Sequence, residues 1–542
     1  MIRRRDFMKG VAGTALLTGA SAAGHAQAPS DFARGPFAAN WDSLKAGYRA
    51  PNWFRDAKFG IWAHWSAQCV PEAGDWYARN MYLQGSPHYE HHLKTYGHPA
   101  DVGFMEINNL WKAENWNPGE LLDLYKAAGA RYFVALANHH DNFDNYASKF
   151  HAWNATRVGP KKDLIGVWAR EARARGLRFG VSSHSAHAWH WFQVAYGYDP
   201  EGPRAGQRYD AWRLTKYDGA GKWWHGLDPQ ELYAGVTTPV PDGITTTKEY
   251  EAWHQEHDGQ WDEKPPLANP GFVRQWYLRT KDLIDSYQPD LVYFDDNELP
   301  LGQAGLDIAA HYYNSALARH GSLDVVLNGK ILPDARKGAL VEDVERGFRS
   351  DIEPLPWQTD TCIGDWHYNR ARYDQKSYVP AAAVIHRLCD VVSKNGNLLL
   401  SVPLRGDGTI DSEERRVVSE IGSWTRKYGE AIYGSRPWRV AGEGPTEVSS
   451  GQFGEEKIRP FTAEDIRFTV NKGAVYAMTL GRPGQTLSIR SLAGAGIQRV
   501  EAVGVPGSLD FTCDANGLRV TIPDQASHDF GIALKITGTA LI

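Results

Sequence analysis

The chain is poor in cysteine, in long apolar runs and in excess charge, and each shortage argues against a class of protein. Its 542 residues include only four cysteines, without a CxxC pair, so a disulfide framework is not required. No segment approaches ~20 consecutive apolar residues, which predicts no membrane span. Lys+Arg 59 against Asp+Glu 64 leaves a net charge of -5, which argues against nucleic acid or anionic lipid as the main partner.

Aromatic residues are plentiful instead. The chain contains 21 Trp, 25 Tyr and 19 Phe, with 20 His beside them. Flat aromatic faces stack on the C–H-rich faces of sugar rings, so the composition favours a carbohydrate ligand, and a larger core is the alternative explanation. The length suits a (β/α)₈ barrel of ~250 to more than 400 residues plus one appended domain.

The N-terminus resembles a signal for export. Three arginines at residues 3–5 are followed by Phe7, Lys9 and a short apolar stretch that is rich in Gly and Ala. This arrangement is typical of a twin-arginine signal peptide, here residues 1–28, with cleavage after Ala26 or Ala28. It predicts a periplasmic or secreted enzyme that folds before export.

Between residues 40 and 436 short apolar runs alternate with helical stretches. Such runs are typical of strands that are buried on both faces, as in a parallel sheet. Helices are predicted at Pro118–Ala128, Lys162–Arg175 and Pro270–Tyr287 from their Pro and Gly boundaries. The alternation predicts an α/β fold, a (β/α)₈ TIM barrel. Seven strands are visible and an eighth is not resolved: Lys58–Trp65, Tyr132–His140, Arg178–His184, Leu291–Asp296, Asp324–Lys330, Ala339–Glu345 and Asn397–Val402.

Two further regions differ from this pattern. Residues 189–266 form a long aromatic-rich insertion, whose Trp189, Trp191, Trp223 and Trp224 are either sugar platforms or packing residues. Residues 437–542 contain short β-rich runs separated by Gly, Pro and Asn, which predicts a C-terminal antiparallel β-sandwich.

Polar residues end nearly every predicted strand of the barrel, where barrel enzymes hold their active sites. They are His64, His139, His140, His184, Asp295, Lys330 and Glu345. Carboxylates from two different strands are what glycoside hydrolysis needs: one attacks the anomeric carbon and the other protonates the leaving oxygen. Asp295 and Asp296 end one strand, and Glu345 belongs to an acidic cluster with Glu342, Asp343 and Glu353.

The histidines allow a competing hypothesis, a metal-dependent barrel hydrolase. His64, His139, His140 and Asp141 are residue types that hold divalent metals at strand ends. Adjacent residues of a strand point to opposite faces, however, so His139 and His140 cannot both bind one ion without distorting the strand. Imidazoles that hydrogen-bond sugar hydroxyls explain the same residues, and we expect neither a metal nor a cofactor.

Seven segments together resemble glycoside hydrolase family 29, the α-L-fucosidases. The resemblance runs from Trp53 to Trp438, and its order and spacing are more specific than any single segment. The segments are WFRDAKFGIWAHW, GDWYARNMY, HHDNFD, LVYFDD, PWQTDTCIGDWHYN, SKNGNLLLSVP and GEAIYGSRPW.

The resemblance implies a retaining, exo-acting α-L-fucosidase without a cofactor, whose partner is a fucosylated oligosaccharide or polysaccharide. Asp295 would be the nucleophile of a covalent fucosyl-enzyme. Some members place the acid/base at the Glu of a Trp-Glu pair, but here the pair is Trp357-Gln358, which leaves Glu345 first and Glu353 second. The implied sugar-binding residues are His64, Asp75, Trp76, His139, His140, Tyr293 and Trp366, with Trp62 and Trp65 nearby.

Several positions depart from the family pattern. Ser66, Asp296 and Ser401 replace usual Gly, Gly and Asn, and Lys330 stands where an Arg is expected. A second carboxylate at Asp296 would raise a pKa or bind a substrate substituent. These departures keep open a glycan-binding relative that has lost activity.

Overall fold

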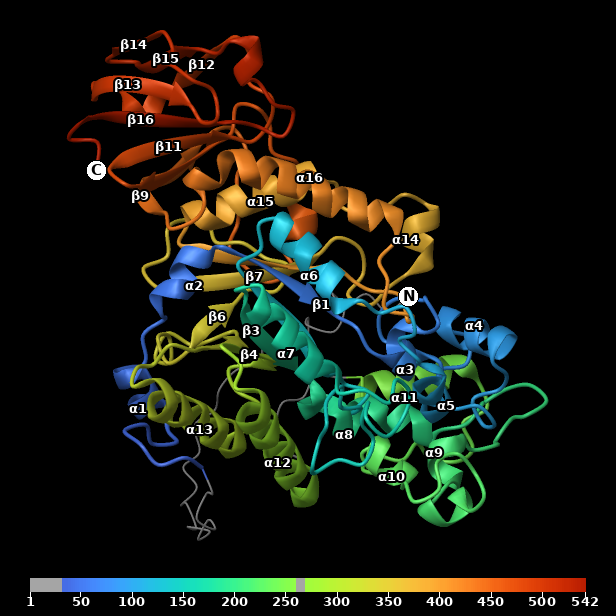
Figure 1. Ribbon diagram of the computed structural model, residues 1–542. Coiled ribbons are helices and arrows are strands. Elements are labelled where there is room, and N and C mark those ends of the chain that lie inside the picture. Colours follow the sequence, from blue (N-terminus) through green and yellow to red (C-terminus); the bar gives the residue numbers. More distant parts are fainter. Residues whose placement is uncertain (1–31, 260–268) are drawn as a thin grey trace, which may run out of the picture.

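The computed structural model describes residues 32–259 and 269–542 (Figure 1). The predicted signal peptide at residues 1–28 therefore lies outside the described residues. Eight parallel strands form a closed barrel in chain order, so the predicted barrel fold is confirmed. The strands are β1 (Phe59–Ala63), β2 (Tyr132–Asn138), β3 (Arg178–Ser183), β4 (Leu291–Asn297), β5 (Val326–Lys330), β6 (Val341–Asp343), β7 (Trp357–Cys362) and β8 (Gly396–Ser401).

The strand that the sequence did not resolve is β7, WQTDTC. All six of its residues are buried, yet four of them are polar, so no apolar run marks the strand. Inside the barrel Gln358 accepts a hydrogen bond from Tyr132 at 3.0 Å and donates one to Asp343 at 2.9 Å. Hydrogen bonds inside the barrel offset the free energy that burying such polar side chains costs.

The helices of the barrel pack around the strands. Pro118 begins α6 and Asn117 caps it, α7 begins at Leu164 after the cap Asp163, and α12 has the predicted bounds. No α-helix lies between β5 and β7, where the chain is described throughout. The helices outside the insertion are α1 (Trp41–Gly47), α2 (Asn52–Ala57), α3 (Tyr77–Asn80), α4 (Pro87–Thr95), α5 (Phe104–Leu110), α6 (Pro118–Ala127), α7 (Leu164–Ala174), α12 (Pro270–Tyr287), α13 (Gln303–His320), α14 (Arg370–Asp374), α15 (Ala381–Ser393) and α16 (Ser412–Tyr428).

The aromatic-rich insertion joins β3 to α12 and is described as far as residue 259. It contains α8 (Ala188–Trp191), α9 (Asp210–Arg213), α10 (Pro229–Leu232) and α11 (Thr247–His257), which lie beside α3–α5 in Figure 1. The buried Arg79 of α3 joins the two parts through an ion pair of 2.6 Å with Asp258. Trp191 and Trp224 are 2% and 1% exposed, so these two are packing residues.

The C-terminal part forms two antiparallel sheets, as predicted. One sheet has the order β13-β16-β11-β10-β9 and the other β12-β15-β14. They lie over α15 and α16 (Figure 1), and a buried ion pair of 2.7 Å joins Arg467 of β10 to Asp390 of α15. The strands are β9 (Arg436–Glu443), β10 (Ile466–Asn471), β11 (Ala474–Thr479), β12 (Thr486–Ile489), β13 (Gly496–Ala502), β14 (Phe511–Asp514), β15 (Gly517–Thr521) and β16 (Ala533–Thr539).

The fold can be compared with what the few cysteines and the lack of long apolar runs predicted. All four cysteines are free thiols, and three of them are buried. Among the helices of the described residues, none combines the length and the apolar character that a bilayer crossing demands.

Candidate active site

One pocket opens at the carboxyl ends of the barrel strands. It is lined by twelve residues from both sides of the barrel, among them most of the residues that the sequence singled out. They are Trp62, His64, Asp75, Trp76, His139, His184, Tyr293, Asp295, Lys330, Glu345, Asp360 and Trp366.

Asp295 and Glu345 meet at one ammonium group. Lys330 ends β5 and donates hydrogen bonds to Asp295 Oδ1 and to Glu345 Oε2. All three side chains are at least nine-tenths buried. Two oxygens that contact one nitrogen lie at most ~6 Å apart. The structure thus brings together the two carboxylates that the sequence predicted on separate strands.

The surroundings of Asp295 favour its ionised form. Burial alone would raise its pKa, but the Lys330 ammonium and hydrogen bonds from His140 and His184 outweigh burial and lower the pKa well below its ordinary value. His184 Nδ1 lies 3.1 Å and His140 Nε2 3.4 Å from Asp295 Oδ2. Asp295 is therefore a carboxylate at neutral pH, held in position from two sides.

Asp360 of β7 is a pocket residue that the sequence analysis missed. The hydroxyl of Tyr293 donates to its Oδ2 at 2.7 Å. Burial, the largest effect, together with the nearby charge of Glu345 raises the pKa of Asp360 to about 7. Asp343 lies deeper, and burial followed by the charge of Asp360 raises its pKa well above the ordinary value. The barrel thus holds one carboxyl with a lowered pKa, Asp295, and two with raised pKa values, Asp360 and Asp343.

Histidines form the wall next to these carboxyls. His64, His139 and His184 directly follow β1, β2 and β3, three neighbouring strands. His64 Nδ1 lies 3.2 Å from Ser401 Oγ, and Gln68 Nε2 lies 3.1 Å from His139 Nδ1.

Two groups of these residues have the composition of a metal site. In each group the ligand atoms lie within 4.8 Å of one another: one group is His64, His139 and His184, and the other is His140, His184 and Asp295. Neither group contains both His139 and His140. The expected alternation does not apply to this pair, because both residues follow the end of β2 and their ring centroids lie 4.3 Å apart.

The third wall comes from two loops. Trp76 has a left-handed backbone with φ 66°, and Trp366 lies with its ring centroid 4.9 Å from that of His64. Asp75 accepts from the backbone amides of Trp366 and His367 at 3.1 and 2.7 Å, so its carboxylate holds the Trp366 loop against the pocket. Burial would raise the pKa of Asp75, but the interactions with His367 and these amides lower it.

Some predicted residues lie outside the pocket wall. His140 is buried behind Asp295, and its Nδ1 lies 2.7 Å from the carbonyl oxygen of His184. Glu353 is 3.5 Å from Arg349 and is not among the lining residues, and Trp65 packs against Trp111 instead. None of the four insertion tryptophans lines the pocket.

His184 and Lys330 line the pocket but are not among the predicted site residues. Both had been recognised as polar residues at strand ends, and that position was the signal that would have found them. Asp360 lay on the unresolved strand, so it carried no such signal.

The chain matches a known family and known proteins along most of its length. The family model described as alpha-L-fucosidase matches residues 25–430. Rat tissue α-L-fucosidase is 25% identical over 539 residues, which covers 97% of this chain and 96% of the relative. The human tissue enzyme is 26% identical over 512 residues and covers 92% and 91%.

Solved structures are also similar. The crystal structure of Thermotoga maritima α-fucosidase has a TM-score of 0.65 at 25% identity and covers 92% of this chain and 100% of its own. The same protein in complex with fucose has a TM-score of 0.64 at 25% identity, covering 92% and 99%. With a family model over most of its length and a shared barrel, the chain belongs to the α-L-fucosidase family of glycoside hydrolases.

Proposed function

We propose that this chain releases terminal α-L-fucosyl residues from glycans with retention, using Asp295 as the nucleophile and Glu345 as the acid/base. The main support for this proposal is that one ammonium, that of Lys330, contacts both carboxylates. The resulting limit of ~6 Å between the contacting oxygens fits the ~5–5.5 Å of retaining enzymes and falls below the ~6.5–9.5 Å of inverting ones.

The reaction has two steps. Asp295 attacks the anomeric carbon while Glu345 transfers its proton to the leaving oxygen, so the glycosidic bond breaks and a fucosyl ester forms. Water then attacks the same carbon, Glu345 accepts its proton, and the ester bond to Asp295 breaks. Because both carboxylates contact Lys330 in the free enzyme, binding of the sugar has to release Glu345 from that ammonium before it acts as an acid.

The walls of the pocket supply recognition. His64 and His139 present imidazole nitrogens to sugar hydroxyls, with Asp75 and Trp76 beside them, and Trp366 presents an apolar face to the C5 methyl group. Tyr293 holds Asp360 at the base. His140 acts through Asp295 and is a positioning residue, because it lies behind the carboxylate.

The nucleophile is tested with Asp295→Ala and 4-nitrophenyl α-L-fucoside. We expect kcat to fall by at least ~10³-fold while circular dichroism and Tm show a folded protein. Ordinary turnover by this variant would overturn the assignment. A wild-type protein that binds fucosides but cleaves none of them would instead be a glycan-binding relative.

The acid/base is tested with a matched pair, Glu345→Ala and Glu353→Ala. Glu345→Ala should lower kcat by ~10²–10⁴-fold on natural glycosides, less on the activated nitrophenyl substrate, and azide should restore turnover as fucosyl azide. Glu353→Ala should behave like the wild type, since this residue lies outside the pocket wall. Azide rescue of Glu353→Ala alone would reverse the two roles. Full activity after EDTA treatment is expected, and its loss would favour metal-dependent hydrolysis.

We further propose that residues 1–28 direct export by the twin-arginine route to the periplasm or medium, ahead of a barrel at 40–436 and a sandwich at 437–542. The support is the arginine cluster at residues 3–5 and the short apolar stretch after it. Replacing Arg3, Arg4 and Arg5 together by Lys should retain the protein in the cytoplasm. Unchanged export of that variant would contradict the proposal.

A further inference from the structure

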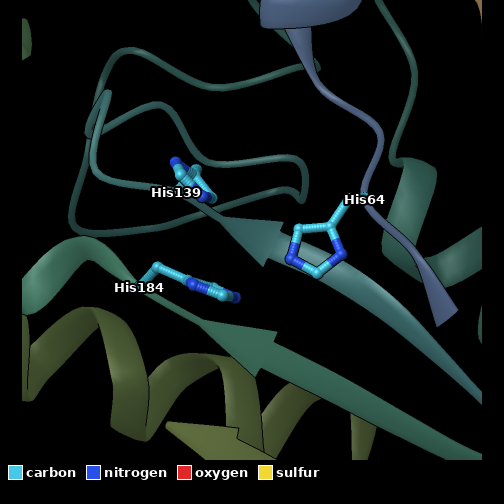
Figure 2. Close-up of side chains that lie close together, drawn as sticks. All are labelled: His64, His139 and His184. Atoms are coloured by element: carbon cyan, nitrogen blue, oxygen red, sulfur yellow. The ribbon is translucent and has the colours of Figure 1, made fainter. Parts of the chain in front are cut away.

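Three imidazoles in the pocket converge from neighbouring strands. His64, His139 and His184 are each the first residue after β1, β2 and β3, so the staggered strand ends bring them to one level of the barrel. Figure 2 shows the three rings around one common space, each on a different strand end. Their ring centroids are 6.2, 5.4 and 4.8 Å apart.

Their spacing is close to that of a metal site. One nitrogen of each ring lies within 4.8 Å of the other two. Around a tetrahedral Zn²⁺ with bonds of ~2.0–2.1 Å the ligand nitrogens lie ~3.4 Å apart, so closing the triangle moves each nitrogen by at most ~0.8 Å. Side-chain rotation alone covers that distance.

The hydrogen bonding of His184 suits coordination. His184 is 2% exposed, and its Nε2 has no hydrogen-bond partner within the described part of the chain. A buried nitrogen without a hydrogen-bond partner costs free energy, and binding of a ligand to that nitrogen removes the cost.

The surrounding charge also favours a cation. Four carboxyl groups line the pocket against a single ammonium, that of Lys330; they are Asp75, Asp295, Glu345 and Asp360. The second group, His140, His184 and Asp295, is the poorer site, because Asp295 already pairs with Lys330 and a metal there would have to displace it.

We propose that His64, His139 and His184 bind one divalent transition-metal ion, with Zn²⁺ as the best-suited ion, and that this ion excludes fucose from the pocket. The metal is an inhibitor here and has no part in hydrolysis. The exclusion follows from the proposed function, since His64 and His139 are the residues assigned to the sugar hydroxyls; the metal site itself does not depend on it.

The position of the ring proton of His139 shows why Zn²⁺ and fucose compete. With Gln68 Nε2 donating to His139 Nδ1, the ring proton sits on Nε2, where it donates to a sugar oxygen. A metal needs the lone pair of Nε2, so the proton moves to Nδ1 and the Gln68 amide turns its oxygen toward it. One pocket thus has a sugar-binding and a metal-binding tautomer.

The experiment is a calorimetric titration of the metal-stripped full chain with Zn²⁺, repeated with Co²⁺, whose visible absorption reports tetrahedral nitrogen coordination. We expect one site, and saturating L-fucose should weaken it. His184→Phe should weaken Zn²⁺ binding by at least ~10-fold, whereas Gln68→Glu should tighten it by ~10–100-fold, since a carboxylate that accepts Nδ1–H strengthens a metal-bound histidine. His225→Ala, at an exposed histidine of the insertion, is the matched control and should bind like the wild type.

Several outcomes would overturn the proposal. They are no Zn²⁺ binding, equal affinity in His184→Phe, or loss of binding in His225→Ala. Gln68→Glu is expected to bind more tightly, which misfolding cannot imitate. Unchanged or weaker binding in a Gln68→Glu protein whose Tm equals that of the wild type counts against the site, even if His184→Phe is unstable. Fucose and Zn²⁺ bound together at full affinity would refute the exclusion. A chain that binds Zn²⁺ but no fucose would contradict the proposed function and leave the metal site standing.

Discussion

Asp360→Asn offers a sharp test of the electrostatics inside the barrel. Asp360 is 1% exposed and accepts from Tyr293 at 2.7 Å, and its other oxygen, Oδ1, has no hydrogen-bond partner among the described residues. Burial, as the main cause, raises the pKa of Asp360 to about 7. An asparagine has nearly the same shape as the neutral acid and keeps an oxygen for Tyr293, but it never ionises.

The size of the effect follows from proton linkage. In the unfolded chain an aspartate has a pKa of ~3.9, so it releases its proton about 3 pH units before folded Asp360 does. The folded state therefore binds more protons between about pH 4 and pH 7, and the stability from this group falls as pH rises through that window. At 1.36 kcal/mol per unit the loss is ~4 kcal/mol. For a barrel of ~400 residues that corresponds to ~5 °C in Tm.

The measurement is the Tm of wild type and Asp360→Asn from pH 4 to pH 8. We expect nearly equal values at pH 4 and a variant that is ~5 °C more stable, relative to wild type, at pH 8. Asp529→Asn, at a carboxylate that is 77% exposed, is the control and should show no such divergence. A constant difference between wild type and Asp360→Asn at all pH values would show that Asp360 is ionised in the fold and would refute the reasoning.

Three further predictions concern the pocket and its support. Lys330→Met removes the cation that lowers the pKa of Asp295, so the acidic limb of kcat/KM against pH should move up by at least ~1 pH unit; an unmoved limb would contradict the role of the ammonium. Trp366→Leu should raise KM for nitrophenyl fucoside more than it lowers kcat, and steady-state kinetics will show whether it does. Arg79→Met leaves the buried Asp258 with His254 as its remaining partner, at 2.6 Å, and should destabilise the fold by ~2–3 kcal/mol, measured by urea unfolding; no loss would rule out the Arg79 ion pair as a support of the insertion.

The sequence predicted most of the fold because its signals are local. Seven of the eight barrel strands overlap a short apolar run of the sequence, and α12 begins at a proline and ends before another one. β7 was not recognised because burial on both faces normally selects apolar residues, whereas here Gln358 and Asp360 have polar partners inside the barrel, Tyr132 and Tyr293. Those partners are distant in the chain, so no local pattern reveals them.

The aromatic surplus shows a second limit of composition. Of the tryptophans that the structure describes, twelve are buried, and only Trp62, Trp76 and Trp366 line the pocket. The composition therefore favoured carbohydrate correctly, but mostly through residues that build the core. Sequence patterns could not separate the two uses, because the exposure of a side chain depends on what packs over it.

Two pairs of adjacent residues at strand ends supply both the pocket wall and its support. At the end of β2, His139 lines the pocket while His140 lies behind Asp295. At the end of β4, Asp295 lines the pocket while Asp296 is 2.8 Å from the buried His187. Each pair thus supplies one group to the pocket wall and one to the packing behind it. Asp296 therefore lies behind the pocket wall, away from a bound sugar. Where the family usually has Gly, this chain has a buried carboxylate, and His187 is its partner.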